Sequence, residues 1–375
     1  MNRARIKLGE GRSYPLILGA GLFPRLAEEL KKNFPAHNYV IISDCPVMKL
    51  YGGELFSLLR KNRLGVHLFD FPAGEENKNR KIWEQLIIRM LRAGIGRDSL
   101  VIALGGGVVS DLAGFVSAVY MRGIPWVAVP TTLLGMVDAS IGGKVGIDLA
   151  YGKNLVGAFW QASAVYMDLE VLRTLPRLQF KNGLAEVVKA GLIKDKELFA
   201  LLERNWKRVL RLSLSELEEI IWRAVRVKVR VVEKDEREIS GERKILNYAH
   251  TIGHGLEALS GYKLLHGIAV SLGMRVEARI SNLLGYFPEA ELKRQNQLLF
   301  QLGFPSRVSG LLAKKLKTRS GKEQFMNYLY KDKKVRAGKI EMVLLREIGR
   351  VKRSQGSWTV PVEEGVIEQA LEEIL

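Results

Sequence analysis

Residues 99–115 of the chain read SLVIALGGGVVSDLAGF, an apolar run followed by three glycines and a second apolar segment. The first run together with the glycines, 99–107, is typical of a short buried strand, and the segment after the glycines is typical of a helix. Comparable apolar runs stand at 14–19, 39–43 and 66–71, and helical patterns such as 79–94 separate them. This alternation predicts an α/β domain built on a mostly parallel sheet.

The periodicity changes near Pro176, where long amphipathic helices replace the alternation. Helices are predicted at 183–193, 215–238 and 267–285. Two strands and a closing helix are predicted at 339–346, 349–355 and 362–375. A second, mainly helical domain is therefore expected to begin near residues 176–182. We divide the chain into an α/β domain, 1–178, and a helical domain, 179–375.

The composition is that of an ordinary soluble globular protein. The chain has 375 residues, 47% of them hydrophobic, and a single cysteine, Cys45. One cysteine cannot form an intramolecular disulfide, and the N-terminal MNRARIKLGE lacks the apolar run of a secretory signal. The most apolar region, 100–130, is interrupted by Asp111 and Arg122, short of the ~20 residues that a spanning helix needs. We expect a cytoplasmic protein with no membrane partner.

The formal net charge is +18, from 58 Lys+Arg and 40 Asp+Glu. Such a charge fits a nucleic acid, an anionic membrane or an anionic small substrate, and it also fits general surface basicity. Basic clusters stand at 314–322 and 331–339. No helix-turn-helix, zinc-finger or aromatic-stacking signature accompanies them, so we expect no nucleic-acid partner.

The three glycines, Gly105, Gly106 and Gly107, stand where the strand gives way to the helix. Glycines there permit close backbone approach, and the unpaired amides of a helix N-terminus favour an anion such as a dinucleotide pyrophosphate. The spacing is not GxGxxG, and a tight structural turn would look the same. Asp111 stands one turn into the helix, where an acid that merely faces solvent would look the same. Further polar residues follow the strand ends or stand in turns: Thr131, Thr132, Asp138, Lys144, Lys153 and Asn154. Ligands of α/β sheets usually bind at strand ends, so together these residues indicate a ligand site.

The segment NYAHTIGHGLEALSGYKLLHG, 247–267, holds three of the five histidines of the chain, His250, His254 and His266. If 242–259 is one helix, four polar residues share one face: Arg243, Asn247, His250 and His254. The opposite side of that helix would carry Ile245, Tyr248, Ile252 and Leu256. A lone histidine is more often structural, but two imidazoles one turn apart can share a metal, and His266 could supply or support a third ligand.

A zinc site of this kind calls for a carboxylate from elsewhere in the chain. Glu186 is attractive because it stands within an apolar helical segment, with Lys189 three residues later on the same side. Without the histidines, a salt-bridged pair on a solvated helix face would be the simpler interpretation.

Ordered segments along the chain resemble the motif series of 3-dehydroquinate synthases. They are LGGGVVSDLAGF, MRG, VPTTLL, VDASIGGK, GKNLVGAF, GLAEVVKAG, KDERE, LNYAHTIGHGLE, LHGIAV and KDKKV, with RSYPLILG and PAGEENK near the start. The resemblance covers nearly the whole chain. It implies an NAD-binding α/β domain, a helical domain with one divalent metal, Zn²⁺ or Co²⁺, and a homodimer.

The activity that the resemblance implies is the conversion of an anionic sugar phosphate, 3-deoxy-D-arabino-heptulosonate 7-phosphate, into 3-dehydroquinate and phosphate. In the family, transient oxidation by NAD precedes β-elimination of phosphate. Reduction, ring opening and an intramolecular aldol closure follow. Other sugar-phosphate cyclases, including an amino-dehydroquinate variant, share much of this pattern, and metal-dependent polyol dehydrogenases share the two-domain plan.

The family's functional residues carry over position by position. The metal ligands match Glu186, His250 and His266. The residues expected to act in catalysis match Asp138, Lys144, Lys189, Arg243, Asn247 and His254, where His254 takes part in proton transfer beside the metal. Further substrate contacts match Arg122, Asn154, Lys228 and one of Lys333 and Lys334. The NAD contacts match Asp44, Glu75, Lys78, Gly105, Gly106, Gly107, Asp111, Thr131, Thr132 and Lys153.

The chain departs from the family pattern at several neighbouring positions. Ser110 and Ala249 stand where glycine is usual, Val145 replaces a usual threonine and Ile268 a usual glutamate. Ala162 replaces a usual proline, and Leu178-Gln179 replaces a usual Arg-Glu pair. These changes remove no proposed ligand, so they bear on the local backbone and on cofactor affinity.

Overall fold

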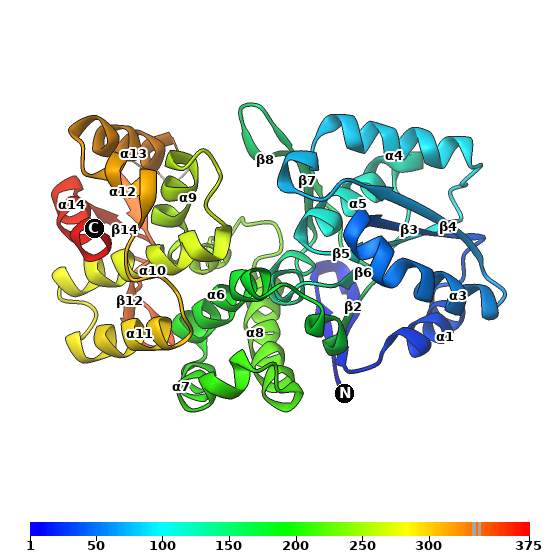
Figure 1. The fold of residues 1–375 in the computed structure, drawn as a ribbon, viewed down its shortest axis with the longest axis horizontal. Coiled ribbons are helices and arrows are strands. Elements are labelled where there is room, and N and C mark those ends of the chain that lie inside the picture. Colours follow the sequence, from blue (N-terminus) through cyan, green and yellow to red (C-terminus); the bar gives the residue numbers. More distant parts are fainter. Residues whose placement is uncertain (332–334, 337–338) are drawn as a thin grey trace. The chain divides into compact units, whose positions relative to one another are not determined.

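A computed structural model of the chain describes residues 1–331, 335–336 and 339–375. The chain forms two compact units, Met1–Pro176 (unit 1) and Arg177–Leu375 (unit 2), drawn in Figure 1. Among the described residues, no helix combines the length and the apolar character needed to span a bilayer.

Unit 1 is built on a seven-stranded sheet in the order β1-β2-β9-β6-β5-β3-β4. The strands are β1 (Asn2–Lys7), β2 (Ser13–Gly19), β3 (Asn38–Asp44), β4 (Gly65–Phe71), β5 (Leu100–Gly105), β6 (Trp126–Pro130) and β9 (Ala164–Asp168). Only β1 runs antiparallel to its neighbour, so the prediction of a mostly parallel sheet is confirmed. The strand predicted at 99–107 is shorter than expected, because Gly107 already begins the next helix.

The middle of this sheet is buried on both faces. Every residue of β5 and β6 is buried, which explains why these strands read as continuous apolar runs. Helices α4 (Arg80–Arg92) and α5 (Gly107–Val119) lie on one face, and α1 (Phe23–Asn33) and α3 (Gly53–Lys61) lie on the other (Figure 1). The shorter helical segments are η1 (Gly9–Gly11), α2 (Cys45–Val47), η2 (Met48–Gly52), η3 (Glu75–Asn77), η4 (Tyr120–Arg122), η5 (Gly135–Ala139) and η6 (Leu169–Arg173).

A β-hairpin stands outside the main sheet where the sequence indicated only turns. Its strands are β7 (Lys144–Leu149) and β8 (Gly152–Phe159), paired antiparallel. Lys153 and Asn154, which were expected to stand in a turn, lie in β8, so that prediction was wrong. Gly146 and Gly157 face each other across the pair so closely that a Cβ on Gly157 would meet Val145 O at 2.1 Å. Small residues are thus required where the two backbones meet.

Unit 2 is mainly helical. Its helical segments are α6 (Arg177–Lys194), α7 (Lys196–Leu210), α8 (Leu214–Lys234), η7 (Glu242–Asn247), α9 (His250–Leu259), α10 (His266–Leu283), α11 (Glu289–Gln301), α12 (Gly310–Leu316), α13 (Arg319–Lys331), α14 (Glu364–Leu371) and η8 (Glu372–Ile374). Helix α10 is central, because it is buried along most of its length and contacts α6, α9, α11 and α14. This explains why its segment is apolar nearly all round.

The late strands pair differently from the prediction of a single pair at 339–346 and 349–355. Strand β11 (Lys339–Met342) lies between β10 (Val335–Arg336) and β14 (Val360–Val362). Strand β12 (Leu345–Glu347) pairs with β13 (Arg350–Val351) in a separate hairpin. Val343 and Leu344 are both buried between β11 and β12, so the chain passes through the core and leaves one sheet before it enters the next.

The helix predicted at 242–259 is broken in two, and that prediction was wrong. The 3-10 helix η7 ends at Asn247, and Ala249 takes a left-handed φ of 68° before α9 begins. Tyr248 holds the break, because its side chain is fully buried and its hydroxyl lies 2.9 Å from Gln295 Oε1. Arg243 and Asn247 therefore do not share a helix face with the histidines of α9.

Helix α10 lies against its neighbours at backbone distance in two places. A Cβ on Gly267 would stand 2.1 Å from Asn182 O of α6, and a Cβ on Gly273 would stand 2.1 Å from Ala249 O beside α9. No side chain fits at either point. The spacing of the three helices is therefore set by contact between their backbones.

Candidate active site

Three side chains from three helices of unit 2 converge at the ends of α9 and α10. Glu186 lies on α6, His250 opens α9 and His266 opens α10. Glu186 Oε1 is 3.7 Å from His250 Nε2 and 3.5 Å from His266 Nε2. One donor atom of each residue lies within 4.8 Å of the other two. Two imidazole nitrogens and one carboxylate oxygen are a donor set that fits Zn²⁺ or Co²⁺ and leaves a coordination position for a substrate.

The protonation of the two histidines differs. Burial lowers the pKa of His250 well below its usual value, and Lys189, His254 and His266 add to the effect. Burial also acts to lower the pKa of His266, but Glu186 and Glu257 outweigh it and raise that pKa to about 10. His250 is thus a neutral imidazole, and His266 holds a proton between two carboxylates. A divalent ion bound here would replace that proton.

Each of these histidines has a partner that orients its ring. His250 Nδ1 donates to Tyr248 O at 3.0 Å, because a carbonyl can only accept, and this leaves Nε2 as the ligand atom. His266 Nδ1 lies 3.5 Å from Glu257 Oε1. The sequence prediction missed Glu257, although it stands three residues after His254 on an apolar helix and is 5% exposed.

His254 lies one turn along α9, beside the cluster. Its ring centroid is 5.2 Å from that of His250, and its Nε2 is 4.0 Å from Glu257 Oε2. The side chain is 45% exposed, in contrast to the buried His250. His254, Glu257 and His266 form a second set of donor atoms within 4.8 Å, which overlaps the first at His266.

Lys189 and Glu186 form a close ion pair on α6. Their side chains are only 4% and 3% exposed, so this face of the helix is not solvated and the simpler interpretation of the pair is wrong. Lys189 Nζ also donates to Leu246 O at 2.8 Å, which ties η7 to α6.

Arg243 is 3% exposed, and its guanidinium donates to Glu236 O at 2.7 Å and approaches Glu238 Oε1 at 3.7 Å. Asn247 ends η7, and Lys228 is half-buried on α8. Lys333 and Lys334 lie outside the described residues.

A second cluster, in unit 1, surrounds the buried ammonium group of Lys78, which is 3% exposed. Lys78 Nζ lies 2.9 Å from Glu75 Oε1, 3.2 Å from Asp111 Oδ2 and 3.4 Å from Asp148 Oδ1. It also donates to Asn154 Oδ1 at 2.7 Å. The structure thus brings together Glu75, Lys78, Asp111 and Asn154 from η3, its C-terminal flank, α5 and β8.

Asp148 is a member of this cluster that the sequence prediction missed. Its Oδ1 accepts the backbone N–H of Asn154 at 2.8 Å, and its own N–H donates to Lys78 O at 2.7 Å. Asn154 has a left-handed φ of 55°, and this bond holds it there. The only signal in the sequence was the single acid that ends the run KVGID.

The cluster shifts the pKa of its members. Burial acts to lower the pKa of Lys78, but Asp111, Glu75 and Asp148 outweigh it and raise that pKa. Burial raises the pKa of Asp111 to about 6, with Lys78 opposing and Glu75 and Asp148 assisting. Lys153 Nζ lies 3.7 Å from Glu75 Oε1, at the edge of the cluster.

The glycine turn opens α5 beside this cluster. Gly106 is the N-cap residue of α5, with no side-chain cap, so amides of the first turn are available to an anion. Thr131 and Thr132 follow β6, and Thr131 N donates to Gly105 O at 2.9 Å. Asp44 ends β3 at the same edge of the sheet, since β3, β5 and β6 are parallel neighbours. Its Oδ1 accepts Val47 N at 3.0 Å, and burial raises its pKa.

Three other predicted substrate residues of unit 1 are not among the ion-pair or hydrogen-bond partners of Lys78 in the part of the chain that the structure describes. Asp138 is in η5 and Lys144 begins β7. Arg122 lies three residues past Val119, the last residue of α5, and Val119 is about 12 Å from Asp111 along the helix axis. The structure does not bring Arg122 to the Lys78 cluster.

Profiles of two protein domains match consecutive parts of the chain. The 3-dehydroquinate synthase N-terminal domain matches residues 68–182, and the C-terminal domain matches 183–335. The chain belongs to the 3-dehydroquinate synthase family. A 3-dehydroquinate synthase of Caldanaerobacter subterraneus subsp. tengcongensis is 42% identical over 352 residues, which cover 94% of this chain and 96% of the relative.

Solved structures of related cyclases have the same fold. The 2-epi-5-epi-valiolone synthase of Streptomyces hygroscopicus subsp. jinggangensis, solved with NAD⁺ and Zn²⁺ bound, has a TM-score of 0.84 and is 28% identical, over 98% of both chains. A 2-deoxy-scyllo-inosose synthase, solved with carbaglucose-6-phosphate, NAD⁺ and Co²⁺, has a TM-score of 0.85 at 24% identity over 100% of both chains. The 3-dehydroquinate synthase family thus shares its architecture with other sugar-phosphate cyclases, and the chain is an enzyme of this kind.

Proposed function

We propose that the chain converts 3-deoxy-D-arabino-heptulosonate 7-phosphate into 3-dehydroquinate and phosphate. The match of both family domains supports the reaction. The observation that carries it is the convergence of Glu186, His250 and His266 on one point, since two imidazoles and a carboxylate from separate helices suit a catalytic divalent ion that displaces the proton of His266.

The same three residues would hold the metal, which would serve as a Lewis acid and template for the substrate hydroxyls. The residues that would hold NAD are Asp44, Glu75, Lys78, Gly105, Gly106, Gly107, Asp111, Thr131, Thr132 and Lys153. Bound there, NAD would supply the hydride-transfer chemistry at the C5 alcohol, and it would be regenerated in each turnover. The uncapped turn at Gly106 supports this assignment, because it offers backbone amides to a pyrophosphate.

The protein's own side chains would orient a substrate that carries a carboxylate and a phosphate. Cationic and amide groups suit it, because charge-assisted hydrogen bonds are the strong ones. The residues proposed for this work are Arg122, Asp138, Lys144, Asn154, Lys189, Lys228, Arg243, Asn247 and one of Lys333 and Lys334. His254 would move a proton beside the metal, and its exposed imidazole, 5.2 Å from the His250 ring, supports that role.

The two parts of the chain would divide this work. Residues 1–178 would bind the nucleotide, and 179–375 would bind the metal and most of the substrate. We also propose that the enzyme works as a homodimer in the cytoplasm.

The test is incubation with the heptulosonate phosphate, catalytic NAD and Zn²⁺, with phosphate release and product identity measured. We expect phosphate and 3-dehydroquinate in equal amounts and no accumulation of reduced nicotinamide. A polyol dehydrogenase would instead accumulate NADH, and an amino-substrate cyclase would turn over the amino analogue faster. His250→Ala is expected to abolish turnover. The same substitution at His37, an exposed histidine of unit 1, is the matched control.

A further inference from the structure

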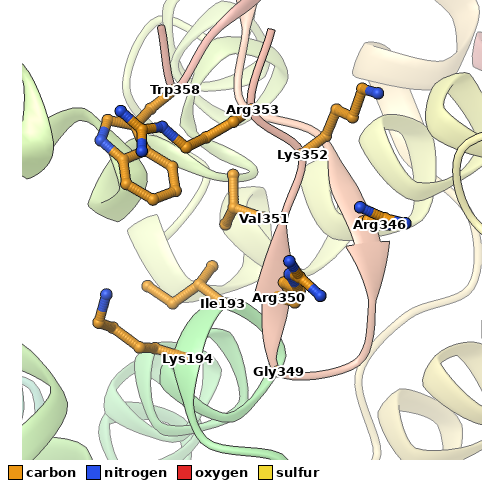
Figure 2. Close-up of a pocket in the computed structure, with 9 residues that line it drawn as sticks. All are labelled: Ile193, Lys194, Arg346, Gly349, Arg350, Val351, Lys352, Arg353 and Trp358. Carbon is orange, nitrogen blue, oxygen red and sulfur yellow. The ribbon is translucent and has the colours of Figure 1, made fainter. Parts of the chain in front are cut away.

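A cavity of about 350 Å³ lies in unit 2, at the C-terminal end of α6 and beside the β12–β13 hairpin (Figure 2). Its lining residues are Ile193, Lys194, Arg346, Gly349, Arg350, Val351, Lys352, Arg353 and Trp358. Lys194 stands eight residues after Glu186 on α6, about 12 Å along the helix axis. The cavity is therefore separate from the proposed metal ligands.

Five of the nine lining residues are cationic, and none carries a carboxylate side chain. Two of the five have an acid nearby. Lys194 Nζ lies 3.4 Å from Glu242 Oε1, and an Arg350 nitrogen lies 3.5 Å from Glu347 Oε1. Both side chains of the Arg350–Glu347 pair are exposed, so this ion pair contributes little binding free energy. Arg346 has no ion-pair partner in the part of the chain that the structure describes, so the cavity keeps a surplus of positive charge.

Ring contacts hold two of these cations, Arg353 and Lys352, in place without carboxylates. The Arg353 guanidinium lies 4.7 Å from the centroid of the Trp358 ring, and Lys352 Nζ lies 4.7 Å from that of Tyr286. The hairpin itself is fixed to α6, because Gly349 N donates to Leu192 O at 2.8 Å. The backbone that carries Arg346 and Arg350 is thus anchored to α6.

The cations fall into two groups in Figure 2. Arg346 and Arg350 lie together on one side, and Arg353 lies against Trp358 on the other. The apolar side chains of Ile193 and Val351 are between the groups, and both are buried. This arrangement suits a molecule with an anionic group at each end of a short apolar or neutral spacer. The volume is at the lower end of the roughly 300–1,000 Å³ of small-ligand pockets, which favours a small molecule over a polymer backbone.

We propose that this cavity binds a small metabolite with two anionic groups, either a bisphosphate or a dicarboxylate, at a site separate from the active site. The proposal does not rest on the proposed function, because binding is measured without turnover.

The experiment is calorimetric titration of the enzyme loaded with NAD and Zn²⁺. The probes are fructose 1,6-bisphosphate and glutarate, each of which carries two anionic groups and is called a dianion below, and orthophosphate as a single-group comparison. The variants are Arg346→Ala/Arg350→Ala in the cavity and Lys314→Ala/Lys317→Ala, which removes equal charge from exposed positions of α12 and its C-cap. We expect one of the dianions to bind more tightly than orthophosphate. The cavity variant should lower the affinity for this dianion at least about 10-fold, and the control variant should lower it less than about twofold.

A third variant, Arg243→Ala, separates the cavity from the proposed substrate site. Binding of the dianion is expected to survive this substitution. The proposal is overturned if neither dianion binds the unmodified enzyme, or if the cavity and control variants lose affinity equally. It is also overturned if Arg243→Ala abolishes binding while the cavity variant retains it.

Discussion

Glu277→Gln tests whether a buried carboxylate positions the histidine-bearing helix. Glu277 lies on α10, is 0% exposed, and accepts from Ala249 N at 2.7 Å and Ile252 N at 3.2 Å. Glu277 thus caps the N-terminus of α9 from a neighbouring helix, because the N-cap residue, Ala249, makes no side-chain hydrogen bond there. A glutamine keeps the shape but replaces one accepting oxygen with an NH₂ group that faces a donor.

The magnitude follows from the two bonds. A hydrogen bond to a charged group contributes about 1.5–3 kcal/mol, and the substitution removes one such bond and leaves the other neutral. We expect a loss of about 2–4 kcal/mol in the local stability of α9. This corresponds to about 30- to 700-fold faster amide exchange, since 1.4 kcal/mol is a factor of ten.

Hydrogen exchange read on a peptide that covers α9 is the assay, and zinc affinity by chelator competition is the second measurement. Glu289→Gln is the control, because Glu289 is in the first turn of α11 but its side chain is 52% exposed. Its effect is expected to stay within about 0.5 kcal/mol. If Glu277→Gln leaves the exchange of α9 as slow as the control does, the capping argument is refuted.

Three further substitutions test the conformation and charges of the two clusters. Ala249→Gly is expected to stabilise the protein by about 0–1 kcal/mol, because relief of the left-handed φ outweighs the added chain entropy; a lower melting temperature would contradict this. The pKa of Asp111 is about 6 in the folded protein, compared with 3.8 for an unperturbed aspartate. The stability that Asp111 contributes is therefore greatest at low pH, and it falls by about 2–3 kcal/mol as the pH rises from 3.8 to about 6. The free energy of unfolding of Asp111→Asn should therefore fall less steeply between pH 4 and 6 than that of the unmodified protein. Equal slopes for the two proteins would contradict the raised pKa of Asp111. His266→Ala is expected to weaken zinc binding by at least about 100-fold in chelator competition, whereas His37→Ala should leave it unchanged.

The sheet of unit 1 was predictable where its strands are buried on both faces. The apolar runs behind β3 and β5 identify such strands without any tertiary information. β1 escaped prediction because NRARIK carries a charge at every second position and only Ile6 is buried. The β7–β8 hairpin escaped because its glycines, which resemble loop residues in the sequence, are needed for close backbone contact.

The histidine cluster was predictable from composition, but its geometry was not. Spacing alone placed His250 and His254 on one helix face, which the structure confirms for α9. Spacing could not show the break at Tyr248, because the burial of that side chain beside Gln295 depends on a segment far along the chain. Glu257 and Glu277 were missed for the same reason: each is an acid on an apolar helix whose partners come from elsewhere in the fold.

The close contacts at Gly267 and Gly273 bear on attempts to change the metal preference by directed evolution. Because the three helices meet main chain to main chain, the separation of the liganding atoms cannot be widened gradually by enlarging side chains between them. Libraries aimed at a larger ion should leave both glycines untouched and vary the ligands themselves, for instance by exchanging Glu186 for a shorter acid.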